Sequence, residues 1–157
     1  MKFSTKEDIE APSAVVFAGL TDFPAFERAA LRRGAEFMRM DTLDSPGVGM
    51  GWNVRFPLRG KWRRVICELR EYDTPNRIAY FAESTGFDMV LELDLVALSR
   101  SRTRLGVQFD IRPRTLPARV KLQSAKLIKS NLARRFATKV QKFAADLELR
   151  HLKLKMP

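Results

Sequence analysis

The chain is poor in the residues that build metal centres and catalytic triads. Its 157 residues include one cysteine, Cys67, and one histidine, His151. One cysteine cannot form an intrachain disulfide or a cysteine-based metal cluster. One histidine near the chain end leaves little material for a zinc site or a histidine-based triad. We therefore expect no metal, no cofactor and no identifiable catalytic residue, and the sequence favours a binding protein over an enzyme.

Long apolar runs are also missing. No segment approaches the run of about 20 apolar residues that a membrane span requires. The start of the chain turns polar after Phe3, so we expect no secretory signal. A hydrophobic fraction of 45% and a charged fraction of 30% are typical of globular proteins. The length suits one domain over residues 1–157. We predict a cytoplasmic protein, with peripheral attachment to a membrane left open.

The positive charge lies at the C-terminal end of the chain. The formal net charge is +11. Residues 1–111 contain 16 basic and 16 acidic side chains, whereas residues 112–157 contain 13 basic and 2 acidic ones. This distribution indicates a neutral body joined to a basic C-terminal element that can attract anionic partners.

Apolar and polar residues alternate through much of the segment 35–111, as they do in strands. The clearest run places five apolar residues at every second position: Phe87, Met89, Leu91, Leu93 and Leu95. Such alternation is typical of an antiparallel sheet with one covered face and one wet face. Short turn-forming links favour a meander of six strands. A first strand at 2–10 and two short helices within 11–34 precede it, the second with Asp22 as a cap.

The C-terminal part predicts one long helix over about 116–150 and a basic tail at 151–157. Its apolar residues recur every three or four positions, at Ala125, Ile128, Leu132, Phe136, Val140, Phe143 and Leu147. Such a helix spans on the order of 50 Å, enough to cross a small sheet. We therefore predict an α+β fold with a seven-stranded curved antiparallel sheet wrapped around a long C-terminal helix and two short helices after the first strand.

The glycine-rich stretch SPGVGMGW, residues 45–52, has the composition of a phosphate-binding loop. A phosphate loop needs a helix directly after its glycines, and the dedicated motif needs Gly-Lys-Ser or Gly-Lys-Thr. Here Trp52, Val54 and Phe56 alternate with Asn53 and Arg55, so a strand follows. Glycines that enter a strand typically permit a bulge or bend. We interpret this loop as bending the sheet.

A long helix laid across a bent sheet can leave a space between them. Two outcomes stay open, because large apolar residues of this kind either line a ligand pocket or simply fill a core. The candidate lining residues are Trp52, Val54, Phe56, Phe87, Met89, Leu91, Phe109, Ile128, Leu132 and Phe136.

The segment IEAPSAVVFAGLTDFPAFE resembles the opening of the START/SRPBCC helix-grip superfamily of polyketide cyclase/dehydrase and lipid-transport proteins. The matching positions are Ile9, Ala11, Pro12, Val16, Phe17, Leu20 and Asp22. The PGVGMGW and YDTPNRIAY turns and the closing helix fit as well, so the likeness covers essentially the whole chain. It implies a helix-grip fold with a cavity between sheet and helix. Its motifs are structural and transfer no catalytic residue and no specific ligand.

Three functions follow as hypotheses. The first is binding, or transport, of a hydrophobic small molecule or lipid. The second is a cyclase/dehydrase- or hydrolase-like enzyme, for which strand residues such as Glu68, Tyr80 and Glu83 are candidates. The third is a basic nucleic-acid-binding module, although the basic helix carries no aromatic stacking platform.

The residues expected to contact an anionic membrane are Arg119, Lys126, Arg134, Arg135 and Lys142. Lys139 could reach an anionic head group or extend into water. The ligand and the oligomeric state stay open.

Overall fold

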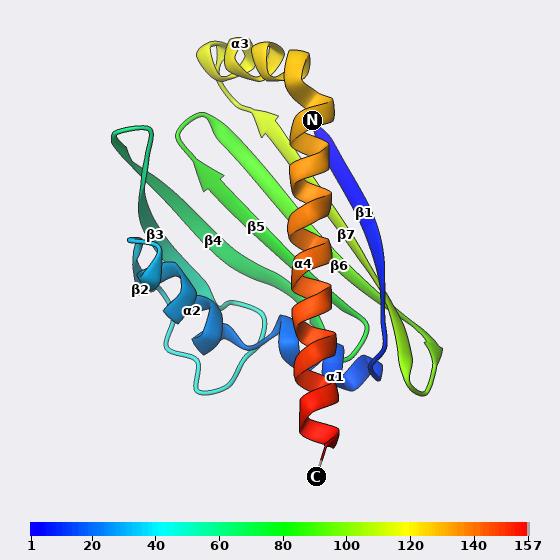
Figure 1. Ribbon diagram of the computed structural model, residues 1–157. Helices are drawn as coiled ribbons and strands as arrows, with labels where there is room; N and C mark the ends of the chain where they lie inside the picture. Colours follow the sequence, from blue (N-terminus) through cyan, green and yellow to red (C-terminus); the bar gives the residue numbers. More distant parts are fainter. Residues whose placement is uncertain (157) are drawn as a thin grey trace.

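The computed structural model describes residues 1–156, and its seven strands form one antiparallel sheet in the order β1-β7-β6-β5-β4-β3-β2. Strands β2 to β7 therefore follow one another as a meander, and β1 pairs with β7 at the far edge (Figure 1). The predicted seven-stranded sheet is confirmed. The strands are β1 (Lys2–Ile9), β2 (Glu36–Arg39), β3 (Gly51–Leu58), β4 (Lys61–Asp73), β5 (Arg77–Ser84), β6 (Phe87–Ser99) and β7 (Arg102–Pro113).

The helices lie on one face of the sheet, except for the helix directly after β7, which lies at one end of it, and the longest helix crosses that face (Figure 1). Two short helices follow β1, as predicted, and the remainder come after β7. The helical elements are α1 (Ser13–Leu20), α2 (Phe23–Arg32), α3 (Leu116–Ala125), the 3-10 turn η1 (Lys126–Ile128) and α4 (Lys129–Lys155). Helix α2 begins where predicted, because the Asp22 carboxylate accepts a hydrogen bond from Ala25 N at 3.2 Å.

The predicted long C-terminal helix is confirmed, but it differs from the expected helix over about 116–150 at two points. The helix is broken at η1, and α4 continues to Lys155, so most of the predicted tail is helical. Contacts elsewhere explain the break. Helix α3 packs on the β5–β6 turn, where Gly86 has φ +83° and a Cβ added to it would lie 3.0 Å from Ala118 Cβ. One straight rod could not pack there and also cross the sheet.

The two halves of α4 are held differently. In the C-terminal half, Ala144 and Leu147 are buried. Gly19 of α1 lies close to Leu147, because a Cβ at that glycine would be 2.5 Å from Leu147 Cδ1. In the N-terminal half, Phe136 and Val140 are only partly buried. The helix is therefore packed tightly at one end and stands off the sheet further along.

The glycine-rich loop joins β2 to β3 and no helix follows it, so the phosphate-loop alternative is excluded. The Asp41 carboxylate accepts hydrogen bonds from Gly51 N at 2.9 Å and from Arg39 Nε at 2.9 Å. Gly49 N donates to Leu69 O at 3.0 Å, which ties the loop to β4. The loop therefore fixes the start of β3 directly before Trp52. No helix within residues 1–156 is long and apolar enough to cross a membrane.

Candidate functional site

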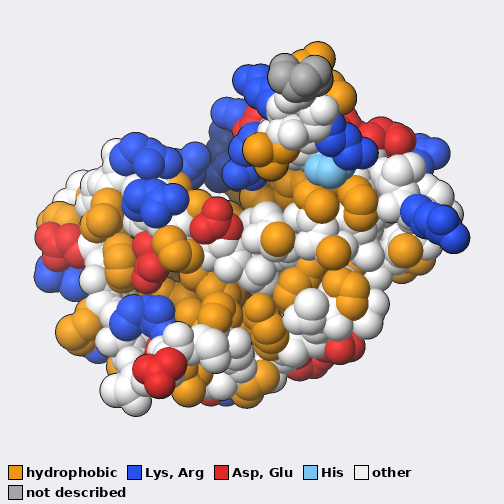
Figure 2. All heavy atoms as spheres, turned by 90° about the horizontal axis from the view of Figure 1, so that it is seen from below, with side chains coloured by type: hydrophobic (Ala, Val, Ile, Leu, Met, Phe, Trp, Pro, Cys, Tyr) orange, Lys and Arg blue, Asp and Glu red, His pale blue; other side chains and the backbone are white. Residues whose placement is uncertain are grey.

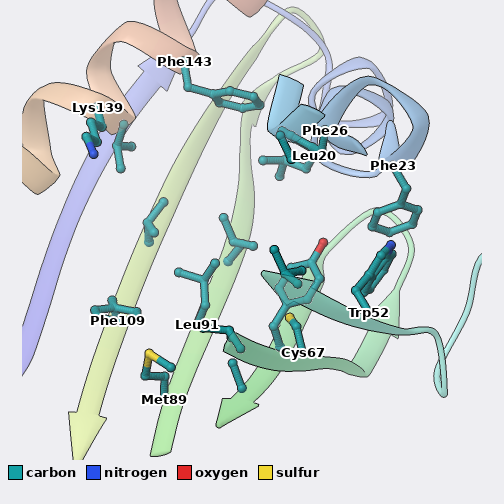
Figure 3. Close-up of a pocket in the computed structure, with 18 of the residues that line it drawn as sticks. Leu20, Phe23, Phe26, Trp52, Cys67, Met89, Leu91, Phe109, Lys139 and Phe143 are labelled. Atoms are coloured by element: carbon teal, nitrogen blue, oxygen red, sulfur yellow. The ribbon is translucent and has the colours of Figure 1, made fainter. Parts of the chain in front are cut away.

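A cavity of about 640 Å³ lies between the sheet, α2 and the part of α4 that stands off the sheet (Figure 3). Its volume falls in the range of small-molecule sites. The walls are apolar apart from Glu27, Cys67, Tyr80 and Lys139 and the indole nitrogen of Trp52. Viewed from the end where α4 terminates, hydrophobic side chains gather beside the helix (Figure 2), so apolar surface also reaches the exterior on this side.

Six of the ten residues proposed from the sequence as pocket lining do line this cavity: Trp52, Val54, Met89, Leu91, Phe109 and Phe136. The other four, Phe56, Phe87, Ile128 and Leu132, are not among its lining residues. All four lie toward the end of the sheet where α3 packs. Phe56 is near the β3–β4 turn, Phe87 follows the β5–β6 turn, and the two helical residues lie in η1 and the first turn of α4. The cavity occupies the middle of the sheet instead.

Helix α2 supplies a wall that the sequence analysis did not identify. Phe23, Phe26 and Ala30 line the cavity from this helix. Their spacing of three and four residues is that of one helical face, so the signal was present. It could be assigned to the cavity only once α2 was known to lie over β2 and β3 rather than against α1. Phe143 of α4 stacks on Phe26 with ring centroids 6.1 Å apart, which links the two helices.

Trp52 is fixed by contacts on three sides. Its indole Nε1–H donates to Glu27 Oε2 at 3.2 Å, joining β3 to α2. The Phe23 ring lies 5.4 Å from it, centroid to centroid, and the guanidinium of Arg39 on the neighbouring strand β2 lies 5.4 Å from the ring centroid. Such aromatic and cation–π contacts each contribute about 0.5–1.5 kcal/mol. Trp52 is therefore a rigid part of the wall, and Glu27 is occupied by it.

Two neutral polar side chains face the cavity floor. Burial raises the pKa of the Cys67 thiol to about 11 and also raises the pKa of the Tyr80 hydroxyl. Both groups therefore stay protonated at neutral pH. The Tyr80 hydroxyl makes no hydrogen bond to another residue of the described chain, so it is available to a polar atom of a guest. Neither group has the neighbouring base that would activate a nucleophile.

Lys139 lines the cavity from α4 and forms no ion pair within residues 1–156 (Figure 3). It can extend into water or reach an anionic group of a guest. The other candidate catalytic residues lie elsewhere: Glu83 pairs with Arg114 at 3.5 Å, and Glu68 lies 3.7 Å from Arg70. Neither glutamate lines the cavity. The described residues also contain no cluster of three or more His, Cys, Asp or Glu side chains suited to a metal ion.

The five residues expected to contact a membrane do not form one surface, because the helix that carries them is broken. Arg119 lies on α3 and Lys126 on η1, whereas Arg134, Arg135 and Lys142 lie on α4. All five are exposed. The break at η1 thus divides the basic surface into a part at the end of the sheet and a part along the long helix.

A seven-stranded antiparallel sheet that grips a long C-terminal helix over an apolar cavity defines a helix-grip domain. The chain belongs to the family described as polyketide cyclase/dehydrase and lipid transport, whose model matches residues 1–148. This confirms the resemblance seen in the sequence.

Solved structures share the fold at low sequence identity. The Zhui aromatase/cyclase from Streptomyces sp. R1128 is 16% identical, with a TM-score of 0.66 over 96% of this chain and 94% of that one. A protein from Thermus thermophilus is 16% identical, with a TM-score of 0.65 over 99% and 100% of the two chains. A START superfamily protein from Mycobacterium smegmatis is 15% identical, with a TM-score of 0.57 over 90% and 97%. No curated protein matched the sequence.

Proposed function

We propose that the protein binds a hydrophobic small molecule or lipid in the cavity between sheet, α2 and α4, and transports it. The observation that carries this proposal is a space of about 640 Å³ whose walls are almost entirely apolar. Transfer of apolar surface from water into such a site is favourable by about 25 cal/mol per Å². The Tyr80 hydroxyl and the Lys139 ammonium add polar partners for an oxygen-bearing or anionic end of the guest.

Binding has more support than catalysis. A cyclase/dehydrase or hydrolase needs an acid, base or nucleophile held against the substrate. Here Cys67 and Tyr80 are kept neutral by burial, and Glu27 already accepts the Trp52 indole hydrogen bond. The enzyme alternative draws on family membership and on the fold shared with an aromatase/cyclase, and fold alone does not assign a reaction.

Docking on an anionic membrane would let such a carrier collect its guest. Two of the exposed cations expected to contact a membrane, Arg119 and Lys126, lie at the same end of the sheet and support this part of the proposal. The other three, Arg134, Arg135 and Lys142, lie apart from them on α4. Binding of nucleic acid has less support, because Phe136 and Phe143 line the cavity and do not form an aromatic platform on the basic side of α4.

A matched pair of variants tests the cavity. Ala82 lines it on β5, whereas Ala97 is exposed on β6. Uptake of the apolar dye N-phenyl-1-naphthylamine, followed by its fluorescence, is expected for the parent protein and for Ala97→Phe. Ala82→Phe fills part of the space and is expected to bind the dye at least tenfold more weakly. Native mass spectrometry and organic extraction of purified protein then identify the guest. Absence of any lipid together with no dye uptake by the parent protein would refute the proposal.

A further inference from the structure

The end of the sheet that carries α3 also carries two β-turns. In an antiparallel meander, alternate turns emerge at the same end, so the β3–β4 turn, the β5–β6 turn and the exit of β7 lie together (Figure 1). Helix α3 is fastened there: Arg114 N donates to Gly86 O at 2.7 Å, and Gly86 lies against Ala118. Residues 55–64 and 114–129 lie on either side of the β5–β6 turn at this end, and we call these two segments the docking end.

The docking end is strongly basic. Residues 55–64 contain five basic and no acidic side chains, and residues 114–129 repeat this composition. Two of these cations are paired: Arg55 with Glu36 at 3.5 Å, and Arg114 with Asp88 at 3.2 Å. Eight others form no ion pair with any described residue: Arg59, Lys61, Arg63, Arg64, Arg119, Lys121, Lys126 and Lys129.

Exposed apolar side chains lie among these cations. Leu116 is 74% exposed, Leu127 is 88% exposed and Trp62 is 52% exposed. Val120 follows Leu116 by one helical turn and is also exposed, so both project from one side of α3. Transfer of these large apolar side chains from water into an apolar phase lowers the free energy. Tryptophan and basic side chains beside aliphatic ones are typical of segments that lie at a bilayer interface.

We propose that the docking end binds the anionic surface of a lipid bilayer, with Trp62, Leu116 and Leu127 entering the interface. A second copy of the chain is a poor partner, because the two unpaired groups of cations would face each other. Nucleic acid is also a poor partner, since the exposed groups on α3 are aliphatic and the Arg55 guanidinium already covers Trp62 at 5.2 Å. This inference rests on the proposed function, which already includes docking on an anionic membrane, and it assigns that docking to one end of the sheet.

The two tryptophans allow docking and cavity binding to be read separately. Trp52 lines the cavity and Trp62 lies at the docking end. In Trp52→Phe, the remaining Trp62 is expected to shift its emission to shorter wavelength when vesicles of equimolar phosphatidylcholine and phosphatidylserine are added. Vesicles of phosphatidylcholine alone are expected to give no shift. In Trp62→Phe, Trp52 is expected to respond to N-phenyl-1-naphthylamine and not to the vesicles.

A charge-matched pair of variants locates the surface. Lys121→Gln/Lys126→Gln is expected to weaken co-sedimentation with the anionic vesicles about thirtyfold, which corresponds to about 1 kcal/mol for each lysine. Arg134→Gln/Arg135→Gln makes the same charge change on α4 and is expected to leave binding unchanged. Leu116→Ser/Leu127→Ser, at two exposed positions that do not support the core, is expected to weaken binding at least tenfold.

Three results would overturn the proposal: no binding to the anionic vesicles, equal losses from the two charge pairs, or a salt-sensitive shift with RNA stronger than vesicle binding. Dye uptake by the same variants separates this outcome from failure of the cavity. If vesicles bind but the dye does not, docking stands and the carrier function falls. If the dye binds but vesicles do not, the reverse holds.

Discussion

The stacked pair Phe26 and Phe143 should control how fast a guest leaves the cavity. Both rings line it, one from α2 and one from α4, with centroids 6.1 Å apart and planes inclined by 26°. Such a pair contributes about 0.5–1.5 kcal/mol beyond the area it buries. Phe26→Leu keeps an apolar wall and removes the stacking. If opening between α2 and α4 limits release, the dissociation rate should rise about two- to tenfold.

Stopped-flow displacement of N-phenyl-1-naphthylamine measures this rate. Phe56→Leu is the control, because Phe56 is half-buried yet does not line the cavity, and it should leave the rate unchanged. Phe143→Leu should reproduce the effect of Phe26→Leu. The double variant should release the dye little faster than either single variant, since one interaction can be lost only once. Effects of the two substitutions that simply add would refute the pairing.

Three further predictions concern stability and reactivity. Thr103 is fully buried and donates to Ala11 O at 2.8 Å, so Thr103→Val should lower the free energy of unfolding by about 1–3 kcal/mol in urea titrations. Thr138→Val, at an exposed helical hydroxyl, should change it by less than about 0.5 kcal/mol, and equal effects would contradict this account. Since burial raises the pKa of Cys67 from 9.0 to about 11, alkylation by iodoacetamide near neutral pH should be about a hundredfold slower in the native than in the unfolded protein. A rate equal to that of the unfolded chain would show that the thiol is not buried. Hydrogen bonds from Arg39 and the Gly51 amide hold the pKa of Asp41 well below its ordinary value, so this stabilisation is present above about pH 4 and is lost as the pH falls through the folded pKa. Asp41→Asn should therefore show a flatter acid limb in thermal unfolding, and an unchanged limb would contradict the assignment.

The fold was predictable because its signals are local. Alternation along β6 and β7 and the turn residues between strands specify an antiparallel meander without knowledge of any distant contact. The break at η1 was not predictable in the same way, since residues 118–150 contain neither glycine nor proline. It depends on α3 packing against the β5–β6 turn, which is a contact between residues far apart in the sequence.

The cavity was predicted in part for a related reason. Parity along a strand identifies which side chains face the helices, so Trp52, Met89 and Leu91 could be proposed. The alternation does not show which part of each strand lies under the cavity. Phe56 and Phe87 lie nearer the end of the sheet, outside the cavity. The basic β3–β4 turn was missed in the sequence for another reason. The charges of residues 1–111 were counted together, and acidic residues elsewhere in that segment cancel the positive charge of the turn.

Helix α4 packs tightly against α1 near its C-terminal end and forms one wall of the cavity further along. The size of the side chains at each place explains the difference. Near its C-terminal end, α4 approaches α1 closely because position 19 is glycine, which leaves room for Leu147. One to three turns earlier the same face carries Phe136, Val140 and Phe143, whose bulk meets α2 and the sheet across a space. Close packing at one end fixes the angle of a rigid rod, and large side chains further along keep that rod away from the sheet. The cavity is thus a consequence of side-chain size along α4, and the guest that we propose would fill the space that these side chains leave.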